Sequence, residues 1–131
     1  MATIPLRSLS PPTLLIVDDD PEVRMLLCEL FVRKGFHVEV AEDGGAAILF
    51  LAQHESPSVI LVDLVMPGIT GPGVLAYLGS KPNLLKIPVA IVSGTPHLAP
   101  HGYRVFKKPV SFAPLLEFVR AACHVSPATA G

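Results

Sequence analysis

Two short apolar runs of this chain each end in aspartates. The run TLLIV leads into Asp18, Asp19 and Asp20, and the run VILV leads into Asp63. Apolar runs of this length, bounded by turn residues, are typical of strands buried on both faces of a sheet. The carboxyl ends of parallel strands meet at one edge, where open α/β sheets place their sites. Carboxylates crowded there repel one another unless they hold a hard cation such as Mg²⁺, so the pattern predicts a metal and phosphate site.

Two further polar segments follow apolar runs in the same way. Ser93 and Gly94 follow the run VAIV, and Lys108 comes shortly after the run YRVF. Together with the aspartates, these residue types make a complete site for phosphoryl transfer, which needs positioning and charge neutralisation. Asp63 would be the nucleophile that carries the phosphoryl group, and Lys108 would act as a point charge on it. The Ser93 hydroxyl and the Gly94 backbone N–H would donate to the phosphoryl oxygens.

The elements that must position these side chains alternate between strands and helices. Strands are expected at residues 13–17, 37–41, 59–62, 89–92 and 103–106. The first helix is expected from Pro21, with Asp20 as N-cap, to Gly35, and the second from residues 43–45 to just before Pro57. A weak third helix is expected over about 73–78, because Gly71, Pro72 and Gly73 disfavour its start, and a last helix over about 111–123. The alternation predicts an α/β fold with a flavodoxin-like, doubly wound, five-stranded parallel sheet, (βα)5.

The fourth crossover departs from this pattern. Only residues 93–102 separate the fourth strand from the fifth, and they include Pro96 and Pro100. A parallel crossover with its helix needs about ten to twelve residues, and prolines break helical hydrogen bonding. Helix 4 is therefore predicted to be missing or reduced to a single turn.

The composition is typical of one folded domain and excludes several function classes. The chain has 131 residues, of which 50% are hydrophobic, and a formal net charge of −1. These values argue against disorder and against a basic nucleic-acid-binding surface. No apolar stretch approaches a membrane span or a signal peptide, and the two cysteines fit a reducing cytoplasm. We expect a flexible lead-in over residues 1–12, one domain over 13–124 and a tail over 125–131.

Four stretches carry a resemblance to a known family. They are LLIVDDDPEVR (14–24), VILVDLVMPGITG (59–71), VAIVSG (89–94) and FKKP (106–109). In this combination the chain resembles a response-regulator receiver domain of two-component signalling, over about residues 13–123. The resemblance implies that the chain takes a phosphoryl group from phosphohistidine in a Mg²⁺-dependent (or Mn²⁺-dependent) reaction and signals through altered protein–protein interaction.

The resemblance also implies a role for each matching residue. Asp63 would be the phosphoacceptor, Asp19 a direct metal ligand and Asp18 a ligand through water. The backbone carbonyl of Val65 would be a further ligand. Ser93 matches the switch hydroxyl of the family and Lys108 its lysine, with Lys107 solvated. The third aspartate, Asp20, is explained by its capping role.

Three features depart from the family pattern. Val105 stands where the family usually has the aromatic residue that moves on phosphorylation, and helix 4 is expected to be absent or short. Val65 and Thr95 occupy positions that tune loss of the phosphate in the family, and neither carries an acid or amide. A side chain that cannot orient water leaves the phosphate longer lived, so slow autodephosphorylation is expected.

We therefore expect a stand-alone cytoplasmic receiver, since the chain ends soon after its last helix. It would be a phosphoacceptor and not an enzyme, with self-catalysed phosphorylation and dephosphorylation only. Its partners would be a sensor histidine kinase or a histidine phosphotransfer protein and an unidentified downstream protein, with no nucleic acid and no membrane insertion, and a homodimer is left open. Two alternatives remain: a phosphorylation-independent pseudo-receiver, and a haloacid-dehalogenase-type phosphatase using the DxD spacing of Asp18 and Asp20.

Overall fold

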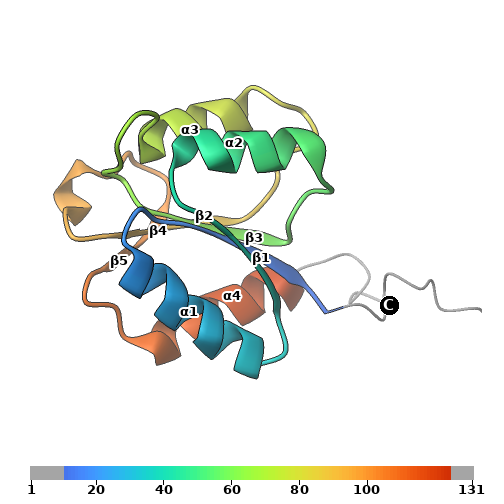
Figure 1. The fold of residues 1–131 in the computed structure, drawn as a ribbon, viewed down its shortest axis with the longest axis vertical. Coiled ribbons are helices and arrows are strands. Elements are labelled where there is room, and N and C mark those ends of the chain that lie inside the picture. Colours follow the sequence, from blue (N-terminus) through green and yellow to red (C-terminus); the bar gives the residue numbers. More distant parts are fainter. Residues whose placement is uncertain (1–10, 125–131) are drawn as a thin grey trace, which may run out of the picture.

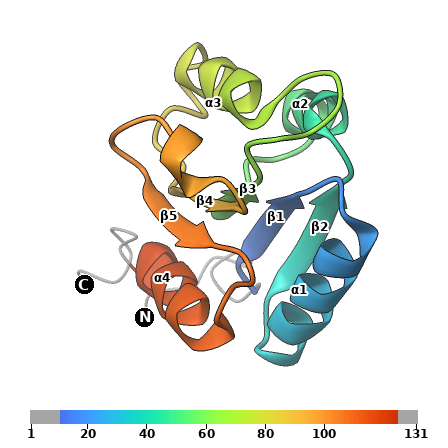
Figure 2. The ribbon, with the colours of Figure 1, turned by 90° about the vertical axis from the view of Figure 1, so that its left-hand side faces the viewer.

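Five parallel strands form one sheet in the order β2-β1-β3-β4-β5, in a computed structural model that describes residues 11–124 (Figures 1 and 2). The strands are β1 (Thr13–Val17), β2 (His37–Ala41), β3 (Val59–Val62), β4 (Val89–Ser93) and β5 (Arg104–Lys107). This order is that of the flavodoxin-like fold, so the predicted fold class is confirmed. The expected tail and most of the expected lead-in lie outside the described residues.

Helices cover both faces of the sheet. They are α1 (Pro21–Arg33), α2 (Gly44–Gln53), α3 (Gly71–Gly79) and α4 (Phe112–His124). Figure 2 shows α1 and α4 on one face and α2 and α3 on the other. Within residues 11–124, no helix has the length and apolar character that a membrane crossing requires.

The apolar residues of the strands divide between two cores because successive side chains of a strand point to opposite faces. In β1, Leu14 and Ile16 pack with Phe31 of α1, whereas Leu15 and Val17 pack with Leu51 of α2. These four residues of β1 are each at most 1% exposed. Burial on both faces explains why this strand is an uninterrupted apolar run that stops where the sheet edge reaches the site.

The first two helices begin where their capping residues predict. The Asp20 carboxylate accepts a hydrogen bond from the Glu22 N–H at 2.9 Å, and Asp43 accepts one from the Ala46 N–H at 2.7 Å. Each bond satisfies a backbone donor that the first turn of a helix leaves free. The prediction that Asp20 is an N-cap is confirmed.

The expectation that residues 71–73 would spoil the start of the third helix was wrong. Helix α3 begins at Gly71, two residues before the predicted start, with Thr70 as its N-cap. Pro72 lies in the first turn, where the missing N–H of proline has no helical partner to lose. Strand β4 ends one residue later than predicted, and β5 and α4 each begin and end one residue later than predicted.

The fourth crossover contains no α-helix. It holds a single 3₁₀ turn, η2 (Pro96–Leu98), closed by a hydrogen bond of 3.0 Å from the Leu98 N–H to the Thr95 carbonyl. The prediction that helix 4 is missing or reduced to one turn is confirmed. The flank of the sheet at β4 and β5 therefore carries a loop where the other crossovers carry helices (Figure 2).

Close packing at Gly71 holds α3 against the end of β3. The Gly71 N–H donates to the Leu64 carbonyl at 3.0 Å. A Cβ atom at Gly71 would lie 2.7 Å from the Leu64 Cα and closer still to the Asp63 carbonyl oxygen. Helix α3 can approach the residue after β3 only because this position has no side chain.

We expect Gly71→Ala to lower the free energy of unfolding by about 1–3 kcal/mol, the usual cost of overpacking a close contact. Gly79→Ala is the matched control, because a Cβ there meets no atom within 4 Å. That substitution should be neutral or stabilising by up to about 1 kcal/mol. Urea denaturation of both variants measures the difference, and equal stability of the two would contradict the packing at Gly71.

Candidate functional site

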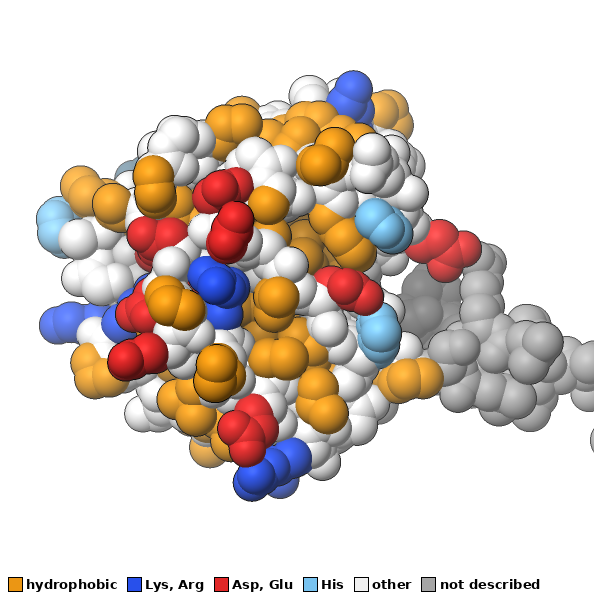
Figure 3. Space-filling view, viewed as in Figure 1, with side chains coloured by type: hydrophobic (Ala, Val, Ile, Leu, Met, Phe, Trp, Pro, Cys, Tyr) orange, Lys and Arg blue, Asp and Glu red, His pale blue; other side chains and the backbone are white. Residues whose placement is uncertain are grey.

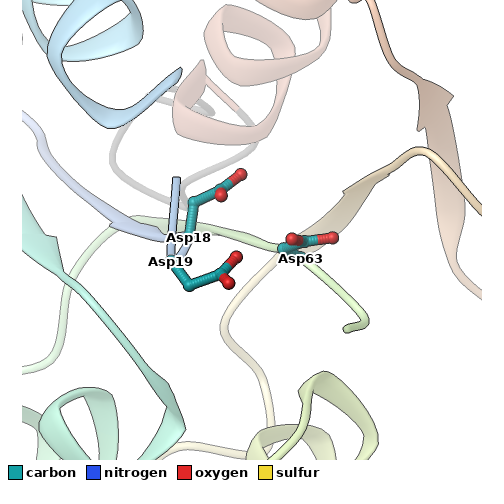
Figure 4. Close-up of side chains that lie close together, drawn as sticks. All are labelled: Asp18, Asp19 and Asp63. Carbon is teal, nitrogen blue, oxygen red and sulfur yellow. The ribbon is translucent and has the colours of Figure 1, made fainter. Parts of the chain in front are cut away.

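The strand register brings Asp18 and Asp63 together. Val17 of β1 pairs with Val62 of β3, so the residues that follow them, Asp18 and Asp63, lie side by side just beyond the ends of the two strands. Figure 4 shows the carboxylates of Asp18, Asp19 and Asp63 beside one another at this edge. One oxygen from each carboxylate lies within 4.8 Å of the others. These three predicted site residues therefore form one cluster.

Lys108 reaches the same cluster from the far strand of the sheet. Ser93 of β4 pairs with Lys107 of β5, and the Lys108 N–H donates to the Ser93 carbonyl at 2.9 Å. The Lys108 Nζ then lies 2.7 Å from Asp18 Oδ2 and 3.4 Å from Asp63 Oδ2. Lys107 is exposed, so of the two adjacent lysines it is Lys108 that contacts the carboxylates.

Burial and charge make this cluster electrostatically demanding. Asp18 is 2% exposed and Asp63 is 7% exposed. Burial raises the pKa of Asp63, and the Asp18 charge adds to this, although Lys108 partly opposes both. For Lys108, burial lowers the pKa, but the hydrogen bond and charge of Asp18, with those of Asp63, outweigh it and leave the pKa raised. The ammonium therefore stays charged beside the carboxylates at neutral pH.

The three aspartates differ in how many of their oxygens are already occupied. In Asp18, Oδ1 accepts the Asp20 N–H at 2.9 Å and Oδ2 pairs with Lys108. In Asp63, Oδ1 accepts the Leu64 N–H at 2.8 Å and Oδ2 accepts a longer hydrogen bond of 3.4 Å from Lys108. Within residues 11–124, the exposed carboxylate of Asp19 makes no hydrogen bond or ion pair. Three carboxylates against one ammonium leave negative charge in excess, and this set of oxygen donors fits Mg²⁺ or Mn²⁺.

The Ser93 hydroxyl lies at the same sheet edge but bonds within its own loop. Ser93 is 1% exposed, and its Oγ accepts the Thr95 N–H at 3.0 Å. The same Oγ lies 3.1 Å from the Thr95 hydroxyl oxygen. Neither bond joins Ser93 to the carboxylates. Gly94 and Val65, the other two predicted site residues, are exposed, and a Cβ atom added at Gly94 would meet no atom within 4 Å.

Sequence reasoning missed one polar contact of the cluster. The Arg24 Nη1 donates a hydrogen bond of 2.8 Å to the backbone carbonyl of Asp18. The available signal was an arginine one turn into the helix that follows the aspartates, but that spacing alone does not say where a long side chain points. The contact places a second cation next to the acidic residues.

A groove opens beside the cluster between α1 and the loop after β5. It has a volume of about 390 Å³ and is lined mainly by apolar side chains, together with Asp20 and Lys108. The apolar residues include Leu26, Leu27, Pro109 and Val110. In Figure 3, acidic side chains gather toward the left, where the strands end, and hydrophobic side chains spread over the region of α1 below.

Comparison with known proteins gives a family match over most of the chain. The family model described as the response regulator receiver domain matches residues 14–119. Protein Rrf1 of Nitratidesulfovibrio vulgaris is 28% identical over 115 residues, which cover 86% of this chain and 83% of Rrf1. Protein PilH of Pseudomonas aeruginosa is 39% identical over 80 residues, covering 61% of this chain and 65% of PilH. The transcriptional activator protein PfeR of the same organism is 38% identical over 86 residues, which are 27% of PfeR.

Solved structures share the fold. The receiver domain of a Francisella response regulator superposes with a TM-score of 0.76 at 25% identity, covering 87% of this chain and 98% of that one. The receiver domain of a sensor histidine kinase from Pseudomonas aeruginosa has a TM-score of 0.79 at 17% identity, covering 87% and 98% of the two chains. That second structure has a magnesium ion coordinated in its active-site cleft.

The raised pKa of Asp63 predicts how its removal changes stability with pH. The folded protein binds a proton at Asp63 more readily than the unfolded chain does, so ionisation of this carboxylate costs stability above its folded-state pKa. In metal-free buffer we expect Asp63→Asn to be more stable than the original chain at pH 7. The gain should shrink as the pH falls through the folded-state pKa, because the original carboxylate is then neutral.

Thermal unfolding in EDTA at several pH values measures this gain. Asp19→Asn is the control for loss of one negative charge, because its carboxylate is exposed, and it should change stability less. A destabilised Asp63→Asn at pH 7, or a gain that does not depend on pH, would contradict the electrostatic account.

Proposed function

Because this chain belongs to the response regulator receiver domain family, whose model matches residues 14–119, we propose that it accepts a phosphoryl group on Asp63 and signals through altered protein–protein interaction. Members of this family are signalling domains. The observation that carries the proposal is that Asp63 has both the Asp19 carboxylate, within 4.8 Å, and the Lys108 ammonium, at 3.4 Å, close to it at the edge of the sheet. The phosphoryl donor we propose is the phosphohistidine of a partner protein.

The residues divide the work of the transfer. A carboxylate oxygen of Asp63 attacks phosphorus as the P–N bond to the donor histidine breaks, and the imidazole leaves with a proton in place of the phosphoryl group. The Lys108 ammonium neutralises charge on the transferring oxygens, which is the main requirement of this chemistry. We assign the Ser93 hydroxyl and the Gly94 N–H as donors to the same oxygens.

The unequal occupation of the aspartate oxygens supports a division of metal ligands. Asp19 and Asp63, with the Val65 backbone carbonyl, would hold Mg²⁺ or Mn²⁺ directly. Asp18 would act through water, because its Oδ1 accepts the Asp20 N–H and its Oδ2 lies 2.7 Å from Lys108, closer than the 3.4 Å between Lys108 and Asp63 Oδ2. When bound, the cation supplies charge neutralisation to the phosphoryl oxygens.

A sensor histidine kinase or a histidine phosphotransfer protein is the partner class we propose for phosphoryl donation. Leu26 of α1 is 56% exposed and lines the groove that also contains Lys108, and the adjacent Met25 is 70% exposed. Exposed apolar side chains next to a reactive site are typical of a docking surface. The match with Rrf1, which extends over 83% of that protein, supports a receiver that acts as a separate module over residues 13–124.

A phosphorylation-independent pseudo-receiver is the second candidate. Val105 of β5 is half-buried against the core of the α2–α3 face, where the sequence lacks the expected aromatic switch residue. An interaction module that does not respond to phosphorylation would retain this fold. The phosphorylation experiment that follows separates the two candidates.

We expect the chain to incorporate one phosphoryl group from a small donor such as acetyl phosphate when Mg²⁺ is present, and Asp63→Ala to incorporate none. Asp43→Asn is the matched control, because Asp43 caps α2 away from the cluster. Intact-protein mass spectrometry measures the incorporation. An unmodified original chain, or undiminished incorporation in Asp63→Ala, would contradict the proposed function.

The phosphorylated form should lose its phosphoryl group slowly, over minutes or longer. Val65 is 57% exposed next to the cluster, and its side chain has no group that can orient an attacking water. A time course of the phosphorylated protein after removal of the donor measures the loss. Val65→Glu should shorten the lifetime, and sub-minute loss in the original chain would show that another group positions the water.

A further inference from the structure

Arg24 lies beside the acidic site but donates its hydrogen bond to a backbone carbonyl and not to a carboxylate. Its half-buried side chain donates from Nη1 to the Asp18 backbone carbonyl at 2.8 Å. None of the ion pairs within residues 11–124 involves Arg24, although three carboxylates lie at the same sheet edge. A hydrogen bond from a charged donor is roughly twice as strong as a neutral one. The guanidinium therefore holds the backbone at this point.

The Asp18 carbonyl, which Arg24 holds, helps to set the direction of the Asp19 side chain. The Asp18 carbonyl and the Asp19 N–H belong to one planar peptide unit, so fixing the carbonyl fixes the plane. The preceding peptide unit is also fixed, because the Asp18 N–H donates to the Ala41 carbonyl at 3.1 Å. The Asp19 carboxylate has no hydrogen bond of its own within the described residues, so its backbone is what aims it.

The anchor for this contact is itself rigid. The Arg24 N–H donates to the Asp20 carbonyl at 3.0 Å in the first turn of α1, and Asp20 in turn caps that helix. The side chain of Arg24 thus crosses from a well-held helix back to the end of β1. The segment between them carries Asp19, whose carboxylate lies within 4.8 Å of those of Asp18 and Asp63.

We propose that Arg24 is a positioning residue that aims the Asp19 carboxylate at the metal site. The proposal rests on the proposed function, because Asp19 is there a direct metal ligand. Residues that orient metal ligands typically contribute 10–100-fold to affinity, so loss of the Arg24 contact should weaken Mg²⁺ binding by about tenfold. Arg24 does not touch the phosphoryl group, and transfer at saturating Mg²⁺ should change little.

A positioning role and a simple charge effect predict opposite results. If the guanidinium acted only through its charge, its removal would make the acidic cluster more negative and would tighten binding of Mg²⁺. If it acts by holding the Asp18 carbonyl, its removal loosens Asp19 and weakens binding. The direction of the change in affinity therefore decides between the two roles.

The test measures the Mg²⁺ dissociation constant of the full chain by isothermal titration calorimetry, with no phosphodonor present. The variants are Arg24→Met, which removes charge and donors, and Arg24→Lys, which keeps the charge. Arg33→Met is the matched control, since Arg33 lies on the same helix and pairs with Glu29 at an exposed position. Thermal unfolding in EDTA checks that each variant folds.

We expect about tenfold weaker binding in Arg24→Met, partial recovery in Arg24→Lys and no change in Arg33→Met. Phosphorylation by acetyl phosphate should slow in Arg24→Met at low Mg²⁺ and approach the original rate at saturating Mg²⁺. Unchanged or tighter Mg²⁺ binding in a folded Arg24→Met would overturn the proposal. If the original chain bound Mg²⁺ but accepted no phosphoryl group, the proposed function would fail while the role of Arg24 in metal binding would stand.

Discussion

The ion pair between Lys108 and Asp18 joins the two sides of the site. It links the residue after β5 to the residue after β1, two strands that β3 and β4 separate in the sheet. A buried carboxylate is tolerated only when a cation and hydrogen bonds compensate its lost hydration. Asp18 obtains these from Lys108 and the Asp20 N–H. This arrangement lets the nearby Asp63 be buried as well while Asp19 stays open to solvent.

Much of this architecture could be predicted because strand ends and site residues coincide. The bounds of β1, β2 and β3 agree with their predicted ranges. For β1 and β3 the reason is that each apolar run is bounded by residues that cannot continue a buried strand. Parallel strands then bring their carboxyl ends to one edge whatever the side-chain details. The presence of Asp18, Asp19, Asp63 and Lys108 in one cluster follows from this rule.

The features that sequence reasoning missed depend on where individual side chains point. The start of α3 was placed too late because proline was treated as a helix breaker in a first turn, where it is tolerated. The bond of Arg24 to a backbone carbonyl has no periodic signature, because a long side chain has many rotamers and only packing selects one. The same holds for Ser93, which bonds to Thr95 in preference to the carboxylates.

The contact between the Ser93 and Thr95 hydroxyls has a consequence for how the state of Asp63 could reach the shortened crossover. Their oxygens lie 3.1 Å apart and share one hydrogen bond, whose donor is either residue. A hydroxyl has a single proton, so it donates to one acceptor at a time. If the Ser93 hydroxyl donates its hydrogen bond to a phosphoryl oxygen, Thr95 must be the donor of the bond between the two hydroxyls. Occupation of the Ser93 hydroxyl would therefore fix the direction of this bond without displacing heavy atoms, one residue before η2, a turn to which the Thr95 side chain makes no capping hydrogen bond.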